Sequence, residues 1–85
     1  MREFIYTITD PEGIHARPAG ELVKLAKNFE SEISISKDGK TVSAKKIFGV
    51  MGLAVKQGHE IKFTFEGADE DTAATSLEEF LKTNL

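Results

Sequence analysis

The chain has no cysteine and no tryptophan, only two prolines, and no long apolar run. Without cysteine it can form neither a disulfide framework nor a thiolate zinc site. No apolar stretch approaches the ~18–20 residues needed to cross a bilayer. Residues 1–4 lack the basic-then-apolar layout of a signal peptide. We therefore expect a cytoplasmic protein with no membrane insertion.

An excess of positive charge is also missing, because 11 basic residues face 14 acidic ones and the net charge is −3. A nucleic-acid-binding α+β domain is an alternative, but net acidity and the lack of aromatic residues interleaved with basic ones disfavour it. Five lysines gather in the middle of the chain. They predict a positive face suited to an acidic protein partner, or ordinary solvated charge. These lysines are Lys37, Lys40, Lys45, Lys46 and Lys56.

The length of 85 residues indicates one domain spanning residues 1–85. Apolar periodicity predicts the element order β-α-β-β-α-β-α. Asp38-Gly39 is a strong signal for an antiparallel hairpin, and Asp69 is a plausible N-cap for the last helix. The fold class is α+β: a two-layer open-faced sandwich with a four-stranded sheet covered on one face by three helices. The strands are expected near residues 4–8, 33–36, 41–43 and 61–66, and the helices near residues 16–29, 46–55 and 70–81.

His15 is the most informative residue, in the segment Gly-Ile-His-Ala-Arg-Pro-Ala at 13–19. A helix is expected to begin directly after it, with Pro18 in the first turn. The amides of Ala16 and Arg17, the helix dipole and the Arg17 guanidinium would then converge on a group attached to the ring. A neutral imidazole with a free lone pair in such a site could carry a phosphoryl group. The alternative is an ordinary cap or surface histidine. His59 is interpreted as a solvated turn residue.

The middle helix carries more apolar surface than a short helix needs for its core contact. Three residues are expected to face the core: Leu53, Val50 and Ala54. Three are surplus and predict a protein-docking surface, because exposed Phe and Met are typical of such surfaces. They are Ile47, Phe48 and Met51. The alternative is that this helix is more deeply buried than its length indicates.

Three segments together resemble the bacterial histidine-containing phosphocarrier (HPr) family. They are residues 13–19, the run Lys-Lys-Ile-Phe-Gly-Val-Met-Gly-Leu at 45–53, and Glu-Gly-Ala-Asp-Glu at 66–70. The likeness extends over essentially the whole chain. It implies an open-faced β-sandwich with an antiparallel sheet, and a carrier rather than an enzyme, with no cofactor and no metal. Nδ1 of His15 would accept a phosphoryl group that enzyme I takes from phosphoenolpyruvate, and sugar-specific IIA proteins would receive it. Arg17 and the amides of Ala16 and Arg17 would support the phosphate.

The resemblance also implies where partners dock and how the chain departs from some relatives. The docking residues would be Gly20, Lys24, Lys27, Ile47, Phe48 and Met51, on an expected monomer. Many members have a regulatory serine where this chain has Lys46, and a lysine cannot be phosphorylated in that way. A regulatory paralogue, which binds a transcription factor or metabolic enzyme according to its phosphorylation state, is the alternative function.

Overall fold

The computed structural model describes the whole chain, residues 1–85. Its elements confirm the predicted order β-α-β-β-α-β-α. None of the helices combines the length and the apolar character that a membrane span requires. The elements are β1 (Arg2–Thr7), α1 (Ala16–Ala26), β2 (Glu32–Lys37), β3 (Lys40–Ser43), α2 (Ile47–Gly52), β4 (Glu60–Glu66) and α3 (Glu70–Asn84).

The four strands form one sheet in the order β1-β4-β2-β3, and every neighbouring pair is antiparallel. Strands β2 and β3 form the predicted hairpin, in which Asp38 and Gly39 both have positive φ (51° and 82°). Such values match the tight turn that Asp-Gly favours. Strand β4 lies between β1 and β2, so Phe63 is opposite Phe4 on one side and Ile35 on the other. Strand β4, from the C-terminal half of the chain, is thereby hydrogen-bonded on both sides to strands of the N-terminal half.

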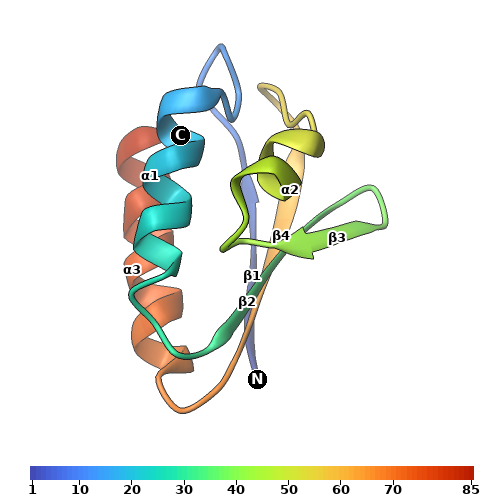
Figure 1. The fold of residues 1–85 in the computed structure, drawn as a ribbon. Helices are drawn as coiled ribbons and strands as arrows, with labels where there is room; N and C mark the ends of the chain where they lie inside the picture. Colours follow the sequence, from blue (N-terminus) through green and yellow to red (C-terminus); the bar gives the residue numbers. More distant parts are fainter.

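The core lies between one sheet face and the helices, which gather on the same side of the sheet (Figure 1). Phe63 and Phe65 on β4 are fully buried, and the ring of Phe4 stacks on Phe63 with centroids 5.4 Å apart. Leu22 of α1 and Leu77 of α3 are also fully buried. The other face of the sheet is covered by no helix, so the predicted open-faced sandwich is confirmed.

Helix α1 ends at Ala26, three residues before the predicted end. The N–H groups of Asn28 and Phe29 donate to the carbonyls of Leu25 and Ala26, three residues back. This bonding tightens the chain into 3₁₀-type turns and stops the α-helix. The Phe29 carbonyl accepts a hydrogen bond from the Lys45 ammonium at 2.7 Å.

Helix α2 is shorter than the predicted range 46–55, because it ends at Gly52. Ala54 takes a left-handed conformation (φ 53°) and its side chain is exposed, so the prediction that it faces the core is wrong. The predicted core positions Val50 and Leu53 are confirmed as buried. The Lys37 ammonium donates to the carbonyls of Leu53 (2.8 Å) and Ala54 (3.2 Å), which satisfies acceptors at the end of this short helix.

Asp69 stands at the N-cap position of α3, as predicted, but its side chain does not cap that helix. Its carboxylate accepts the N–H groups of Glu30 and Ser31, each at 2.9 Å, and the hydroxyl of Ser31. Together these hydrogen bonds, led by the one from the Ser31 hydroxyl, hold the pKa of Asp69 below its usual range. Asp69 therefore fastens the start of α3 to the segment that leads into β2.

Candidate functional site

His15 occupies the N-cap position of α1, and the helix begins at Ala16 as predicted. Its backbone is extended (φ −95°, ψ −178°), and its carbonyl accepts the Ala19 N–H at 2.9 Å. The side chain makes no capping hydrogen bond and is 38% exposed. The ring is therefore accessible to solvent and does not cap the start of the helix.

The N-terminus of α1 has unpaired backbone N–H groups and no acidic residue to neutralise the helix dipole. The N–H groups of Ala16 and Arg17 donate to no acceptor in the protein, and Pro18 has no N–H to donate. No acidic residue lies in the first turn. Free amides at the positive end of a helix dipole favour an anion. The feature predicted from the order of these residues is thus present next to the imidazole.

Arg17 lies beside His15 in space as well as in sequence. Both line a small open pocket at the start of α1, and the Arg17 side chain is exposed. The remaining lining residues are Asp10, Pro18, Glu21 and Asn84. A guanidinium that forms no ion pair beside an accessible imidazole is free to bind the oxygens of a phosphoryl group.

Two carboxylates that sequence analysis missed face the other side of the His15 ring. Nε2 is 3.5 Å from Oε2 of Glu12 and 3.9 Å from Oδ2 of Asp10. Asp10 is held in place because its Oδ1 accepts the Glu12 N–H at 2.8 Å. The signal in the sequence is the turn Asp-Pro-Glu-Gly at 10–13, but only the turn's conformation shows that both carboxylates reach the ring.

Gly13 allows the loop that carries His15 to press against the segment following α2. Gly13 has φ 67°, and a Cβ at this position would lie 2.2 Å from the Val55 carbonyl oxygen. That same oxygen accepts the N–H of Ile14 at 3.0 Å, and the Ile14 side chain is buried. The loop before α1 and the loop after α2 meet at one end of the molecule (Figure 1).

The predicted docking residues lie on two helices that pack against each other, α1 and α2. On α2, Phe48 is 88% exposed and Met51 is 40% exposed. Ile47 is only partly exposed and packs against the core, so its prediction as surplus surface is partly wrong. On α1, Gly20, Lys24 and Lys27 are exposed. We refer to Gly20, Lys24, Lys27, Ile47, Phe48 and Met51 as the docking patch.

The positive face predicted for the middle of the chain is smaller than expected. Lys37 and Lys45 are partly buried, and their ammonium groups bind backbone carbonyls at the ends of the two shorter helices. Lys40, Lys46 and Lys56 are exposed. Because the long stems of two lysines fold back onto the protein, their charges serve local structure rather than a free surface.

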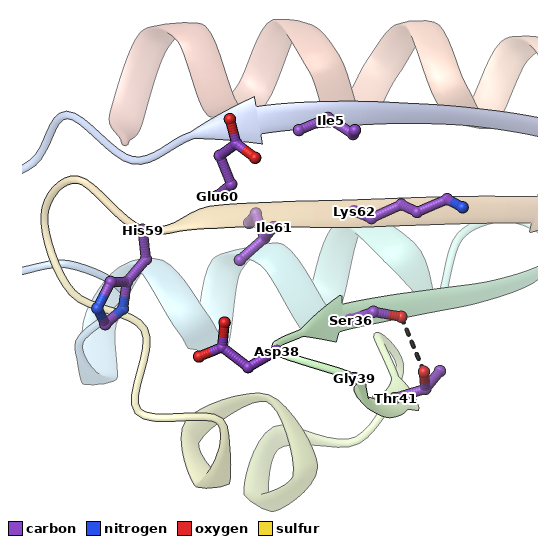
Figure 2. Close-up of a pocket in the computed structure, with 9 residues that line it drawn as sticks. All are labelled: Ile5, Ser36, Asp38, Gly39, Thr41, His59, Glu60, Ile61 and Lys62. Carbon is purple, nitrogen blue, oxygen red and sulfur yellow. Dashed lines mark hydrogen bonds between the residues drawn. The ribbon is translucent and has the colours of Figure 1, made fainter.

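A larger hollow lies on the open face of the sheet (Figure 2), and none of its lining residues belongs to the pocket of His15. The hydroxyls of Ser36 and Thr41 there are 2.8 Å apart and bind each other. His59 stands at the edge of this hollow. Its Nδ1 accepts the Lys56 N–H at 3.0 Å and the residue is partly exposed at a turn, in agreement with its interpretation as a turn residue.

Comparison with known proteins finds similarity to one protein family along nearly the whole chain. Residues 2–83 match the family model described as the PTS HPr component phosphorylation site. The chain is 47% identical over 77 residues to the phosphocarrier protein HPr of Lysinibacillus sphaericus, and the match covers 91% of this chain and 88% of that protein. It is also similar to a crystal structure of HPr from Thermoanaerobacter tengcongensis, with 41% identity, a TM-score of 0.94, and coverage of 98% of this chain and 93% of the other.

A second similar structure is a dimer. It is Crh, the catabolite repression containing protein of Bacillus subtilis, whose crystal structure is a swapped, intertwined dimer. The identity is 36%, the TM-score is 0.78, and the match covers 94% of this chain and 92% of that chain. The same architecture thus occurs among similar proteins both in HPr and in a protein named for catabolite repression.

Proposed function

Because the chain belongs to the HPr family of phosphocarrier proteins, we propose that it carries its phosphoryl group on Nδ1 of His15. It receives the group from phospho-enzyme I and passes it to IIA proteins or domains that serve sugar uptake. The transfers take place in the cytoplasm. The observation that supports this most directly is the accessible His15 ring beside the unpaired amides of Ala16 and Arg17. The protein is a carrier and not an enzyme acting on a small molecule.

The chemistry of each transfer follows from this arrangement. The lone pair of Nδ1 attacks phosphorus and forms the new N–P bond, while the bond from phosphorus to the donor nitrogen breaks and its electron pair stays with the donor. Arg17 donates hydrogen bonds to the phosphoryl oxygens, and the Ala16 and Arg17 amides add backbone donors. The pocket is open, so two partners can reach the ring in turn and supply most of the catalysis.

The docking patch provides the surface that both partners would contact. Phe48 is an exposed aromatic side chain of the kind that anchors protein interfaces, and Met51 lies next to it on α2. Lys24 and Lys27 would pair with acidic groups at the rim of a partner. We propose that the protein acts as a monomer, although the similar Crh structure is a dimer.

A regulatory role is the second candidate, because Crh is named for catabolite repression and resembles this chain throughout. In this chain the residue preceding α2 is Lys46, which is exposed at the N-cap. A lysine offers no hydroxyl for phosphorylation, so a regulatory role would depend on the state of His15 itself. Binding of both phosphoforms to transcription factors or metabolic enzymes distinguishes the two candidates.

The central test is to replace His15 and, as a matched control, the other histidine. With phosphoenolpyruvate and enzyme I, we expect wild-type protein and His59→Ala to take up an acid-labile phosphoryl group, and His15→Ala to take up none. Mass spectrometry measures the adduct, and circular dichroism checks that each variant is folded. Normal labelling of His15→Ala would exclude the proposed carrier residue.

The docking patch is tested by placing a charge on it and on a distant apolar position. Phe48→Glu should keep the fold, because the ring is 88% exposed, and should weaken enzyme I binding by roughly tenfold or more. Ile5 is 63% exposed on β1, and it lines the hollow on the open face. Ile5→Glu should therefore leave binding unchanged. Equal affinities of wild type and Phe48→Glu in calorimetry would remove α2 from the interface.

A further inference from the structure

The carboxylates of Asp10 and Glu12 have no part in the function proposed above, yet both face Nε2 of His15. We propose that these two residues are positioning residues that keep a proton on Nε2, so that Nδ1 retains the lone pair. This inference rests on the proposed role of His15 as carrier. It assigns a function to the turn at 10–13, which otherwise only connects β1 to α1.

The turn holds the Asp10 carboxylate at a fixed place beside the ring. Its Oδ1 accepts the Glu12 N–H at 2.8 Å, and its backbone carbonyl accepts the Gly13 N–H at 2.9 Å. Pro11 restricts the backbone between them. The second oxygen, Oδ2, is left to face Nε2. The Asp10 side chain is 25% exposed and that of Glu12 is 75% exposed, so Asp10 is the better-fixed of the two.

These contacts distinguish the two tautomers of a neutral imidazole. Such a ring carries one proton, on either Nδ1 or Nε2, and the other nitrogen has a lone pair. With the proton on Nδ1, the lone pair of Nε2 would face two negatively charged oxygens and be repelled. With the proton on Nε2, the N–H faces two acceptors and is attracted to both. The carboxylates therefore favour the tautomer in which Nδ1 is the nucleophilic atom.

The same proton matters when the phosphoryl group leaves. Forming the N–P bond uses the Nδ1 lone pair and leaves the ring with positive charge, which the two carboxylates offset. In the next transfer the N–P bond breaks, its electron pair returns to Nδ1, and the ring departs neutral with its Nε2 proton in place. A ring that had lost this proton would have to depart as an anion, which is a poorer leaving group. Arg17 and Glu21 are the other charged residues around this pocket.

The test is the double variant Asp10→Asn with Glu12→Gln, which removes both charges. The amide introduced by Asp10→Asn keeps a side-chain oxygen for the turn, and the separate Glu12→Gln variant changes only the exposed group. Nitrogen NMR of the neutral His15 ring should show the Nε2–H tautomer in wild type and a new Nδ1–H population in the double variant. The rate constant for phosphoryl transfer from enzyme I should fall roughly tenfold, as when other partners that orient a functional histidine are removed. Glu60→Gln removes a charge from an exposed residue of the separate hollow on the sheet and should change neither quantity.

Two results have distinct meanings. Ring nitrogen shifts that are the same in wild type and in the double variant would overturn the inference, even if transfer were slower. A wild-type protein that accepts no phosphoryl group would instead refute the proposed function. The tautomer measurement needs no phosphorylation, so the two failures are separable.

Discussion

The N-termini of α1 and α3, the two longest helices, differ in the charge that their first turns carry. The helices lie side by side and run in opposite directions (Figure 1). Helix α1 begins after His15 with no acid in its first turn, whereas α3 begins with Glu70 and Asp71. Of these, Glu70 is fully engaged: it accepts the Gly67 N–H at 3.2 Å and pairs with the Met1 amino group at 3.0 Å.

The chain thus has two helix N-termini with different electrostatic surroundings, one with acidic residues and one without. At α3, the hydrogen bond from the N-terminal amino group and the one from the Gly67 N–H lower the pKa of Glu70, so the carboxylate stays ionised against the helix dipole. The first turn of α1 contains no acidic residue. The first turn of α3 carries negative charge of its own, and the first turn of α1 is available for an anion brought from outside.

The largest expected effect comes from making α1 resemble α3. Ala16 is exposed at the first position of α1, and Ala16→Glu places a carboxylate where the phosphoryl group would bind. We expect phosphoryl uptake to slow by about tenfold or more, since donors preorganised for an anion are then occupied or opposed. Helix stability should rise slightly, by about 0.5 kcal/mol. Rapid-quench transfer assays and thermal unfolding measure the two changes.

The matched control adds an acid to the helix that already has them. Thr72 is exposed in the first turn of α3, and Thr72→Glu should leave the phosphoryl uptake rate unchanged. If Ala16→Glu and Thr72→Glu slowed uptake equally, general negative charge would explain the loss and the contrast between the two helix starts would have no functional meaning.

A smaller effect, on stability alone, is expected at Asp69. Because its pKa is lowered from 3.8 in the folded protein, its stabilising contribution is present above that value and is lost as pH falls through the folded pKa. Asp69→Asn should lower Tm at about pH 7, and the difference from wild type should shrink towards about pH 3. Phosphoryl uptake at low temperature should not change. A constant difference in Tm across this pH range would show that the charge of Asp69 is not involved.

Much of the fold could be predicted from the sequence because its signals are local. Alternating residues on β1 and β4 mark the strands, Asp38-Gly39 marks the hairpin, and both are observed. The end of α2 was not predicted: Ala54 is left-handed, and the carbonyls that follow the helix are bound by the Lys37 ammonium from β2, a contact that no local pattern indicates. The hydrogen bonds of Asp69 to Ser31 link positions 38 residues apart, which no local pattern indicates.

The candidate site divides in the same way. His15, Arg17 and the start of α1 are adjacent in sequence, so a motif and a helix signal were enough to place them together. The exposure of Phe48 also followed from an apolar arc wider than the core requires. The approach of Asp10 and Glu12 to the ring was missed, because it depends on how a four-residue turn folds back. Turn-forming residues predict that the chain reverses direction, but they do not predict the positions of the side chains in the turn.

The contact between Gly13 and the Val55 carbonyl has a consequence for how this surface can evolve. Any side chain at position 13 would force the two loops apart, because its Cβ would lie 2.2 Å from that oxygen. Main-chain packing, and not the exposed side chains, therefore holds the loop before α1 against the segment after α2. Substitutions of exposed residues on α1 and α2 can therefore alter the affinity for a partner protein without displacing the loop that carries His15.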